Sequence, residues 1–154
     1  MVQINGGIMK ILISACLCGI GCRYDGKSIC YEKLDQLNQA HTLIPICPEI
    51  LGGLPTPRPP AEIQHHRVIT CQGDDVTPQY KKGAEEALKI AKMLHCSCAI
   101  LKERSPSCGC GKIYDGTFSK TLKSGDGITA SILKQAGIKI FGESQIDEVL
   151  KENE

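Results

Sequence analysis

The stretch KILISA at residues 10–15 decides the fold of this chain. It is a short apolar run with β-branched residues, and it leads directly into Cys16 and a loop that contains Gly19 and Gly21. A run of this length and composition, ended by glycines, is typical of a β-strand followed by a loop. We therefore predict a buried strand that ends beside a thiol.

Further strands of the same kind are predicted along the chain. They are residues 43–47 (LIPIC), 98–101 (CAIL) and 138–141, with a small strand at 68–71. Pro45 cannot donate to a sheet ladder, so the strand at 43–47 belongs at an edge. Residues 52–60 (GGLPTPRPP) are too rich in proline for regular structure, and residues 105–116 are expected to form a loop.

Helical spacing of apolar residues separates these strands. We expect helices at 32–39, 77–94, 127–136 and 144–153. A capping box formed by Ser144 and Asp147 is expected to cap the N-terminus of the last helix. Strands that alternate with helices predict an α/β fold, in which a mostly parallel sheet carries helices on both faces in a Rossmann-like three-layer arrangement. Residues 1–8 are expected to form a tail and residues 9–154 a single domain.

The composition excludes several classes of protein. Hydrophobic residues make up 42% of the 154 residues, which excludes a disordered chain, and no apolar run is long enough for a transmembrane helix. A net charge of +1 gives no electrostatic footprint for nucleic acid or an anionic membrane. The chain has ten cysteines, and its first residues do not resemble a signal peptide. This combination indicates a cytoplasmic protein whose thiols serve metal or redox chemistry.

Three cysteines occupy the ends of predicted strands. Cys16 and Cys47 each end one, and Cys108 lies in the loop that follows the strand at 98–101. Ligands of open parallel sheets bind outside the carboxyl ends of the strands, so these three thiols could converge on one crevice. The spacing fits neither a zinc ribbon nor a clustered ferredoxin motif. Cys71, Cys96 and Cys98 are better explained as buried apolar residues, whereas Cys18, Cys22 and Cys110 are ambiguous.

Several polar residues near these thiols have a structural and a chemical interpretation. Ser105 lies three residues before Cys108, where its hydroxyl could simply cap a turn. Glu49 lies two residues after Cys47 and is by default solvated. Arg58, inside the proline-rich segment, could face an anion or a carbonyl, although a solvated arginine is the simpler expectation. Adjacent His65 and His66 point apart in an extended chain and are not expected to share a metal.

Six ordered motifs resemble the domain-of-unknown-function 523 family, which includes thiouracil desulfidase. The resemblance runs from about residue 9 to residue 143, which is nearly the whole chain. The motifs are SACL (residues 14–17), RYDG (23–26), CPE (47–49), GGLPTPRPPAE (52–62), LKERSPSCG (101–109) and IYDG (113–116). The resemblance implies a [4Fe-4S] cluster bound by Cys16, Cys47 and Cys108, with a fourth iron that no protein residue binds. It also implies that Glu49 and Ser105 are catalytic.

The activity implied by this resemblance is removal of sulfur, as hydrosulfide, from a thiolated nucleobase or nucleoside. The open iron would act as a Lewis acid on the thiocarbonyl sulfur, and Glu49 would move protons as water attacks the carbon. No net electron transfer is needed, so the reaction is hydrolysis. Two alternatives stay open: a non-catalytic metal-binding, thiol-redox or sulfur-carrier module, and an enzyme that uses Cys108 as nucleophile.

Overall fold

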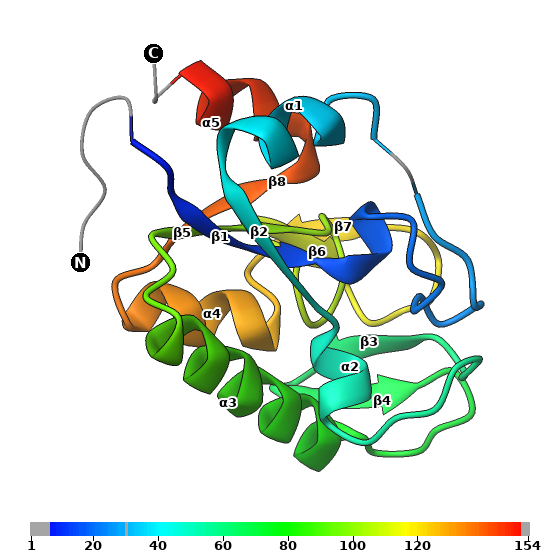
Figure 1. Cartoon of the computed structure of the whole chain (residues 1–154). Coiled ribbons are helices and arrows are strands. Elements are labelled where there is room, and N and C mark those ends of the chain that lie inside the picture. Colours follow the sequence, from blue (N-terminus) through cyan, green and yellow to red (C-terminus); the bar gives the residue numbers. More distant parts are fainter. Residues whose placement is uncertain (1–6, 30, 152–154) are drawn as a thin grey trace.

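The computed structural model describes residues 7–29 and 31–151. Its centre is a four-stranded sheet of β1 (Lys10–Ser14), β2 (Thr42–Ile46), β5 (Cys98–Leu101) and β8 (Lys139–Gly142), in the order β2-β1-β5-β8 (Figure 1). Every neighbouring pair is parallel. The prediction of a mostly parallel α/β sheet is confirmed, and β2, which contains Pro45, is an edge strand as expected.

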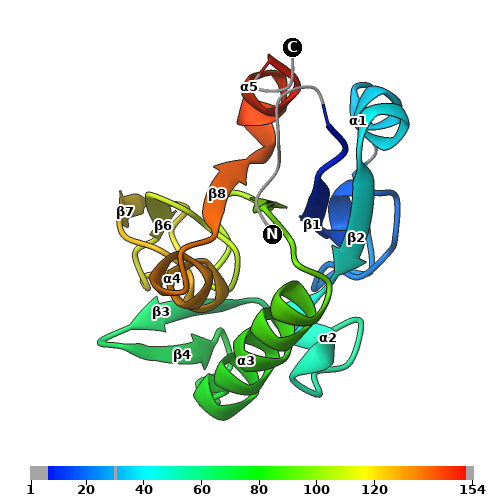
Figure 2. The same cartoon turned by 60° about the vertical axis from the view of Figure 1, so that its left-hand side comes forward.

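Helices cover both faces of this sheet. Figure 2 shows α1 (Leu34–Ala40) and α5 (Ile146–Lys151) on one side, and α3 (Thr77–Met93) and α4 (Ile128–Gln135) on the other. The alternating side chains of β1 explain the arrangement, because Ile11 and Ile13 pack with the first pair of helices and Leu12 with the second. All three are fully buried, so β1 forms the centre of both apolar layers.

Two antiparallel hairpins extend beyond the sheet. They pair β3 (Ala61–Gln64) with β4 (Arg67–Thr70), and β6 (Lys112–Tyr114) with β7 (Leu122–Ser124). The buried Glu62 joins them, since its Oε1 accepts hydrogen bonds from the backbone N–H groups of Gly116 and Phe118 at 2.9 and 3.1 Å. The sequence predicted only β4, and the expectation of a continuous loop over 105–116 was wrong at β6.

The chain also contains short helical turns that sequence periodicity is too coarse to detect. These are η1 (Ala15–Leu17), α2 (Pro48–Leu51) and η2 (Glu143–Gln145). The proposed capping box at the last helix was wrong, because the backbone and hydroxyl of Ser144 donate to Glu103 and Asp147 pairs with Lys33. Of the predicted tail, residues 1–6 lie outside the described part of the chain. No helix within the described part is long and apolar enough to cross a bilayer.

Candidate functional site

Polar and thiol-bearing segments follow three adjacent strands at the carboxyl edge of the sheet. Cys47 comes directly after β2, Cys16 lies two residues beyond the end of β1, and Cys108 lies in the loop after β5. Because β2, β1 and β5 are neighbours and parallel, their carboxyl ends meet at one edge. The structure thus has the strand order that the convergence of these thiols requires.

A fourth cysteine connects two of these thiols. Cys16 and Cys22 are buried in the same apolar cluster, against which Cys47 packs, and the Sγ of Cys47 lies 3.7 Å from the backbone carbonyl oxygen of Cys22. The hydrogen bond with Cys16 is the largest influence on Cys22 and raises the pKa of its thiol to about 11, opposed by the bond with Cys47 and assisted by burial. The bond with Cys22, together with burial, also raises the pKa of Cys47 well above its usual range. Cys16, Cys22 and Cys47 therefore form one continuous group, here called the thiol trio.

Cys108 approaches the same place from the other side. Its side chain is buried, which raises the pKa of its thiol to about 12, while hydrogen bonds with Ser14 and Ser107 act against this rise. The Sγ of Cys108 lies 3.8 Å from Ser107 Oγ. The charge of Cys47 also contributes to raising the pKa of Cys108. Two hydroxyls are thus in position to donate to the sulfur of Cys108 once it is a thiolate.

The loop that carries Cys108 is anchored on the first turn of α4. The carbonyl of Pro106 accepts from the N–H of Ile128, and that of Ser107 from the N–H of Thr129 at 2.8 Å. Gly127 makes this close contact feasible, since a Cβ atom there would lie 2.4 Å from the Ser107 carbonyl oxygen. The N–H groups that a helix start leaves unpaired are therefore used to fix the loop rather than to bind an external anion.

Ser105 has both of its lone pairs occupied. Its Oγ accepts hydrogen bonds from the backbone N–H groups of Ser107 at 3.0 Å and Cys108 at 2.9 Å. The turn-capping role considered from the sequence is therefore present. A hydroxyl has one hydrogen and two lone pairs, so Ser105 can interact with a ligand only as a donor.

Cys47 and Glu49 are placed by the short helix α2. Pro48 is at its first position, where a missing N–H costs nothing. The helix packs on α3 through two glycines at which the backbones touch: a Cβ on Gly83 would lie 1.8 Å from the Pro48 carbonyl oxygen, and one on Gly52 would lie 1.9 Å from that of Gln79. Close contact between the backbones of α2 and α3 thus sets the positions of the thiol and the carboxylate.

Glu49 is paired with Arg58 inside the protein. Arg58 Nε donates to Glu49 Oε2 at 2.8 Å, and Nη2 contacts the same oxygen. The side chains are only 5% and 15% exposed, so the expectation that both are solvated was wrong. Arg58 also donates to the carbonyls of Pro55 and Cys22 at 3.1 and 2.9 Å, and so contacts both an anion and carbonyl groups.

Tyr80 is a buried residue that the sequence did not single out. It lies on α3 and is 3% exposed. Burial, and then the negative charge of Glu49, raise the pKa of its phenol far above the usual range. Its position on the core face of a long helix, in a chain with few aromatic residues, was the one available signal.

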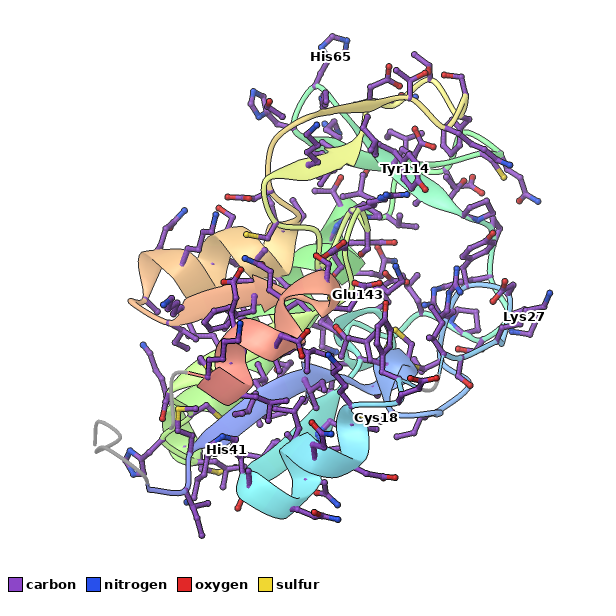
Figure 3. The ribbon with its side chains drawn as sticks, turned by 90° about the horizontal axis from the view of Figure 1, so that it is seen from above. Cys18, Lys27, His41, His65, Tyr114 and Glu143 are labelled. Carbon is purple, nitrogen blue, oxygen red and sulfur yellow. The ribbon has the colours of Figure 1, made fainter. Side chains whose placement is uncertain are left out.

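A cavity lies on another part of the molecule. It has a volume of about 790 Å³ and is bordered by the hairpins and the start of α4, including His65 and His66. Figure 3 shows His65 at the outer end of its hairpin, far from Cys18, which follows Cys16 by two residues. The cavity is therefore distinct from the edge of the sheet that carries Cys16, Cys47 and Cys108, here called the thiol edge.

The donor set of the thiol edge fits a cluster better than a single ion. Within the described residues, no group of three or more His, Cys, Asp or Glu side chains is close enough to hold one metal ion. In an iron–sulfur cluster each thiolate binds a different iron, so the sulfurs are spread over the width of the cluster. Soft thiol ligands on three neighbouring strand ends suit such a group.

The fold and this edge together define a class of protein: an α/β domain with a cysteine-lined site at the carboxyl ends of parallel strands. Residues 11–145 match the model of the family described as 2-thiouracil desulfurase, and the chain belongs to this family. The resemblance to the domain-of-unknown-function 523 family is thereby confirmed.

Two similar proteins support the assignment. The chain is 44% identical over 150 residues to the Bacillus subtilis (strain 168) protein YbbK, which is described as uncharacterized, and the match covers 91% of this chain and 99% of that one. A solved structure described as the [4Fe-4S]-dependent thiouracil desulfidase TudS (DUF523Vcz) has 45% identity and a TM-score of 0.85. That match covers 92% of this chain and 95% of the TudS chain.

Proposed function

We propose that this protein is a [4Fe-4S]-dependent desulfidase that removes sulfur as hydrosulfide from a thiolated pyrimidine by hydrolysis. The observation that carries the proposal is the arrangement of Cys16, Cys47 and Cys108 on three adjacent strand ends beside the paired Glu49. The family assignment and the likeness to TudS support it.

We assign the cluster ligands to Cys16, Cys47 and Cys108. When bound by three thiolates, the cluster would supply one open iron that acts as a Lewis acid toward the thiocarbonyl sulfur. Ser14 and Ser107 are placed to donate hydrogen bonds to the sulfur of Cys108. Such donors offset the cost of burying a thiolate.

Glu49 is assigned as the general acid and base. Both of its hydrogen bonds with Arg58 use Oε2, so Oε1 remains to accept a proton from the attacking water and return it to the ring or the leaving sulfur. Arg58 holds the carboxylate in one orientation, which a proton transfer requires.

Ser105 is assigned to substrate positioning through its hydroxyl hydrogen. Because its lone pairs are occupied by backbone N–H groups, it would donate to a ring nitrogen or carbonyl oxygen of the base. We expect a free nucleobase or nucleoside in the cytoplasm, since a net charge of +1 offers little attraction to nucleic acid.

The direct test is an assay of the reconstituted protein. The protein is purified without oxygen, loaded with iron and sulfide, and incubated with 2-thiouracil and 4-thiouracil while hydrosulfide is measured. We expect about four irons per chain, as the cluster formula requires, and release of hydrosulfide. A loaded protein that releases none from any thiolated base would overturn the substrate assignment.

A pair of variants tests the ligand assignment separately. We expect Cys108→Ala to lose bound iron and the visible absorption of the cluster, whereas Cys71→Ala, which removes an exposed thiol beyond β4, keeps both. Full iron content in Cys108→Ala would remove this residue from the ligand set. About one zinc and no iron in the unaltered protein would instead favour the non-catalytic metal-binding alternative.

A further inference from the structure

The loop after β5 and the first turn of α4 meet at two buried hydroxyl groups. Ser107 Oγ lies 2.8 Å from Thr129 Oγ1, and these two residues are 1% and 0% exposed. The same Ser107 oxygen lies 3.8 Å from the Sγ of Cys108, which is 5% exposed. A buried chain of hydrogen-bonding atoms thus runs from the sulfur of a proposed ligand to helix α4, and Thr129, at its far end, has no assigned role in the proposed reaction.

A thiolate at Cys108 fixes the direction of this chain. Either of the two hydroxyls can donate to the other. The form of cysteine that binds metal is the thiolate, which has no hydrogen and can only accept, so Ser107 must give its one hydroxyl hydrogen to the sulfur. The hydrogen between the two hydroxyl oxygens then comes from Thr129. The order of donation is therefore from Thr129 to Ser107 and from Ser107 to Cys108.

We propose that Thr129 is a positioning residue, which acts through Ser107 to strengthen the hydrogen bond on the sulfur of Cys108 in the cluster-loaded protein. This inference rests on the proposed function in so far as Cys108 is a cluster ligand. Consecutive hydrogen bonds polarise one another, so donation by Thr129 makes the hydroxyl of Ser107 a stronger donor. It also holds that hydroxyl in the orientation that points its hydrogen at the sulfur.

This hydrogen bond would change the properties of the iron. Hydrogen bonds to ligand sulfurs are among the features that set the reduction potential of an iron–sulfur cluster, and they raise it by withdrawing electron density from the sulfur. An open iron with less electron density is a stronger Lewis acid toward a thiocarbonyl sulfur. Loss of such outer partners typically lowers metal affinity about 10- to 100-fold. Thr129 would thus serve the reaction although Ser107 separates it from the sulfur.

The alternative is that Thr129 only holds the loop in place, but the backbone already does so. The carbonyl of Ser107 accepts from the N–H groups of Thr129 and Ala130 at 2.8 and 3.2 Å. Ser105 Oγ fixes the loop from within by accepting from the N–H groups of Ser107 and Cys108. None of these bonds uses the side chain of Thr129. Thr129→Val keeps the branched shape of the side chain, so it removes the hydroxyl while the anchors of the loop remain.

A double-variant cycle on the reduction potential tests the proposal. The unaltered protein, Thr129→Val, Ser107→Ala and the double variant are loaded with iron and sulfide without oxygen. The midpoint potential is then measured by stepwise reduction while the visible absorption is followed. We expect Ser107→Ala to lower the potential, Thr129→Val to lower it by less, and the double variant to equal Ser107→Ala, because Thr129 acts only through Ser107. Additive shifts, or an unchanged potential in Thr129→Val, would overturn the proposal.

Further variants separate the hydroxyl from the shape of the side chain. Thr129→Ser keeps a hydroxyl and should have the potential of the unaltered protein, whereas Thr129→Ala is a second deletion and should behave as Thr129→Val does. The control is Ser131→Ala on the same helix, which removes a hydroxyl that contacts Gln135 and should leave the potential unchanged. A potential in Thr129→Ser as low as that in Thr129→Ala would contradict the proposal.

The rate at which a chelator removes iron gives a second measurement. We expect faster loss from Thr129→Val and Ser107→Ala than from the unaltered protein and Ser131→Ala, and equal rates in all four would count against the proposal. A loaded protein that shows the expected cycle but releases no hydrosulfide would support this inference and overturn only the substrate assignment. A protein that binds no iron would overturn the ligand assignment and this inference with it.

Discussion

At the scale of single residues, Arg58 connects the separate parts of the site. Its guanidinium contacts Glu49 from α2, the carbonyl of Pro55 from the proline-rich segment and the carbonyl of Cys22 from the loop after β1. A planar group with five donors can satisfy several acceptors in fixed directions, which a lysine could not do. One side chain thereby links Glu49 to the thiol trio.

Substitution of Glu49 should separate catalysis from cluster binding. In Glu49→Gln the amide oxygen still accepts from Arg58, so the fold and the thiols are preserved, but the group can no longer take a proton. We expect iron content equal to that of the unaltered protein and turnover reduced about 10²- to 10⁴-fold, the usual contribution of a general base. The measurement is hydrosulfide release per iron, and loss of the cluster in this variant would argue that Glu49 has a structural role instead.

Substitution of Arg58 should destabilise the protein through the charge that it leaves behind. Arg58→Met leaves the 15% exposed Glu49 carboxylate without its partner, and removal of one member of a buried pair costs about 3–5 kcal/mol. Urea unfolding measures the loss. The double variant Glu49→Gln/Arg58→Met should be more stable than Arg58→Met alone, and a double variant that is equally unstable would mean that lost packing is the cause.

At the scale of elements, the site depends on where α2 sits. This helix has four residues and could not persist alone, because isolated helices of this length are far from stable in water. Its position is fixed by backbone contact with α3 at Gly52 and Gly83. The element that carries Glu49 is therefore placed by tertiary packing rather than by its own propensity.

Addition of one methyl group at Gly83 should move α2. Gly83→Ala would raise the helix propensity of α3 by about 1 kcal/mol, yet its Cβ would lie 1.8 Å from the carbonyl oxygen of Pro48. We expect the clash to dominate, with a net loss of about 1–3 kcal/mol in the free energy of unfolding and reduced iron binding through Cys47. The exposed Glu85→Ala on the same helix is the control, and a more stable Gly83→Ala with full iron content would refute the close contact.

At the scale of the whole molecule, a buried histidine lies at the opposite end of the sheet. His41 precedes β2 and is 4% exposed, and its Nδ1 accepts a hydrogen bond from the N–H of Met9, just before β1, at 3.1 Å. Its Nε2 is buried and has no partner among the described residues. Burial lowers the pKa of His41 below 6.5, because no group there compensates a charged imidazole.

This histidine should make the stability of the folded protein depend on pH. Below pH 6.5 the unfolded chain takes up a proton at His41 that the folded protein does not bind until its lowered pKa is reached, so stability falls as pH decreases through this window. His41 can contribute at most about 1.4 kcal/mol per pH unit to this slope. Urea unfolding between pH 5 and 7.5 should show a smaller slope in His41→Asn, which keeps an acceptor near the Nδ1 position. An unchanged slope would assign the effect to other groups.

The sequence by itself determined the sheet, its helical cover and the family. Apolar runs such as residues 98–101, which are β5 to the residue, are local signals, and their alternation with helices leaves few ways to arrange the chain. Six ordered motifs identified the family, and Pro45 indicated the edge position of β2 because proline lacks an N–H. The five proposed site residues came from the same motifs.

Only the tertiary structure decided how the site is assembled. Three contacts join segments that are distant in the sequence or lack a periodic pattern. They are the burial of Arg58 against Glu49, the contact of the Cys47 sulfur with the backbone of Cys22, and the packing of α2 on Gly83. A charged residue is expected to be solvated until the position of its partner is known. Helix α2, with four residues, and strand β6, with three, are too short to show a repeated pattern of apolar residues. Such contacts depend on the summed packing of the chain, which no local stretch encodes.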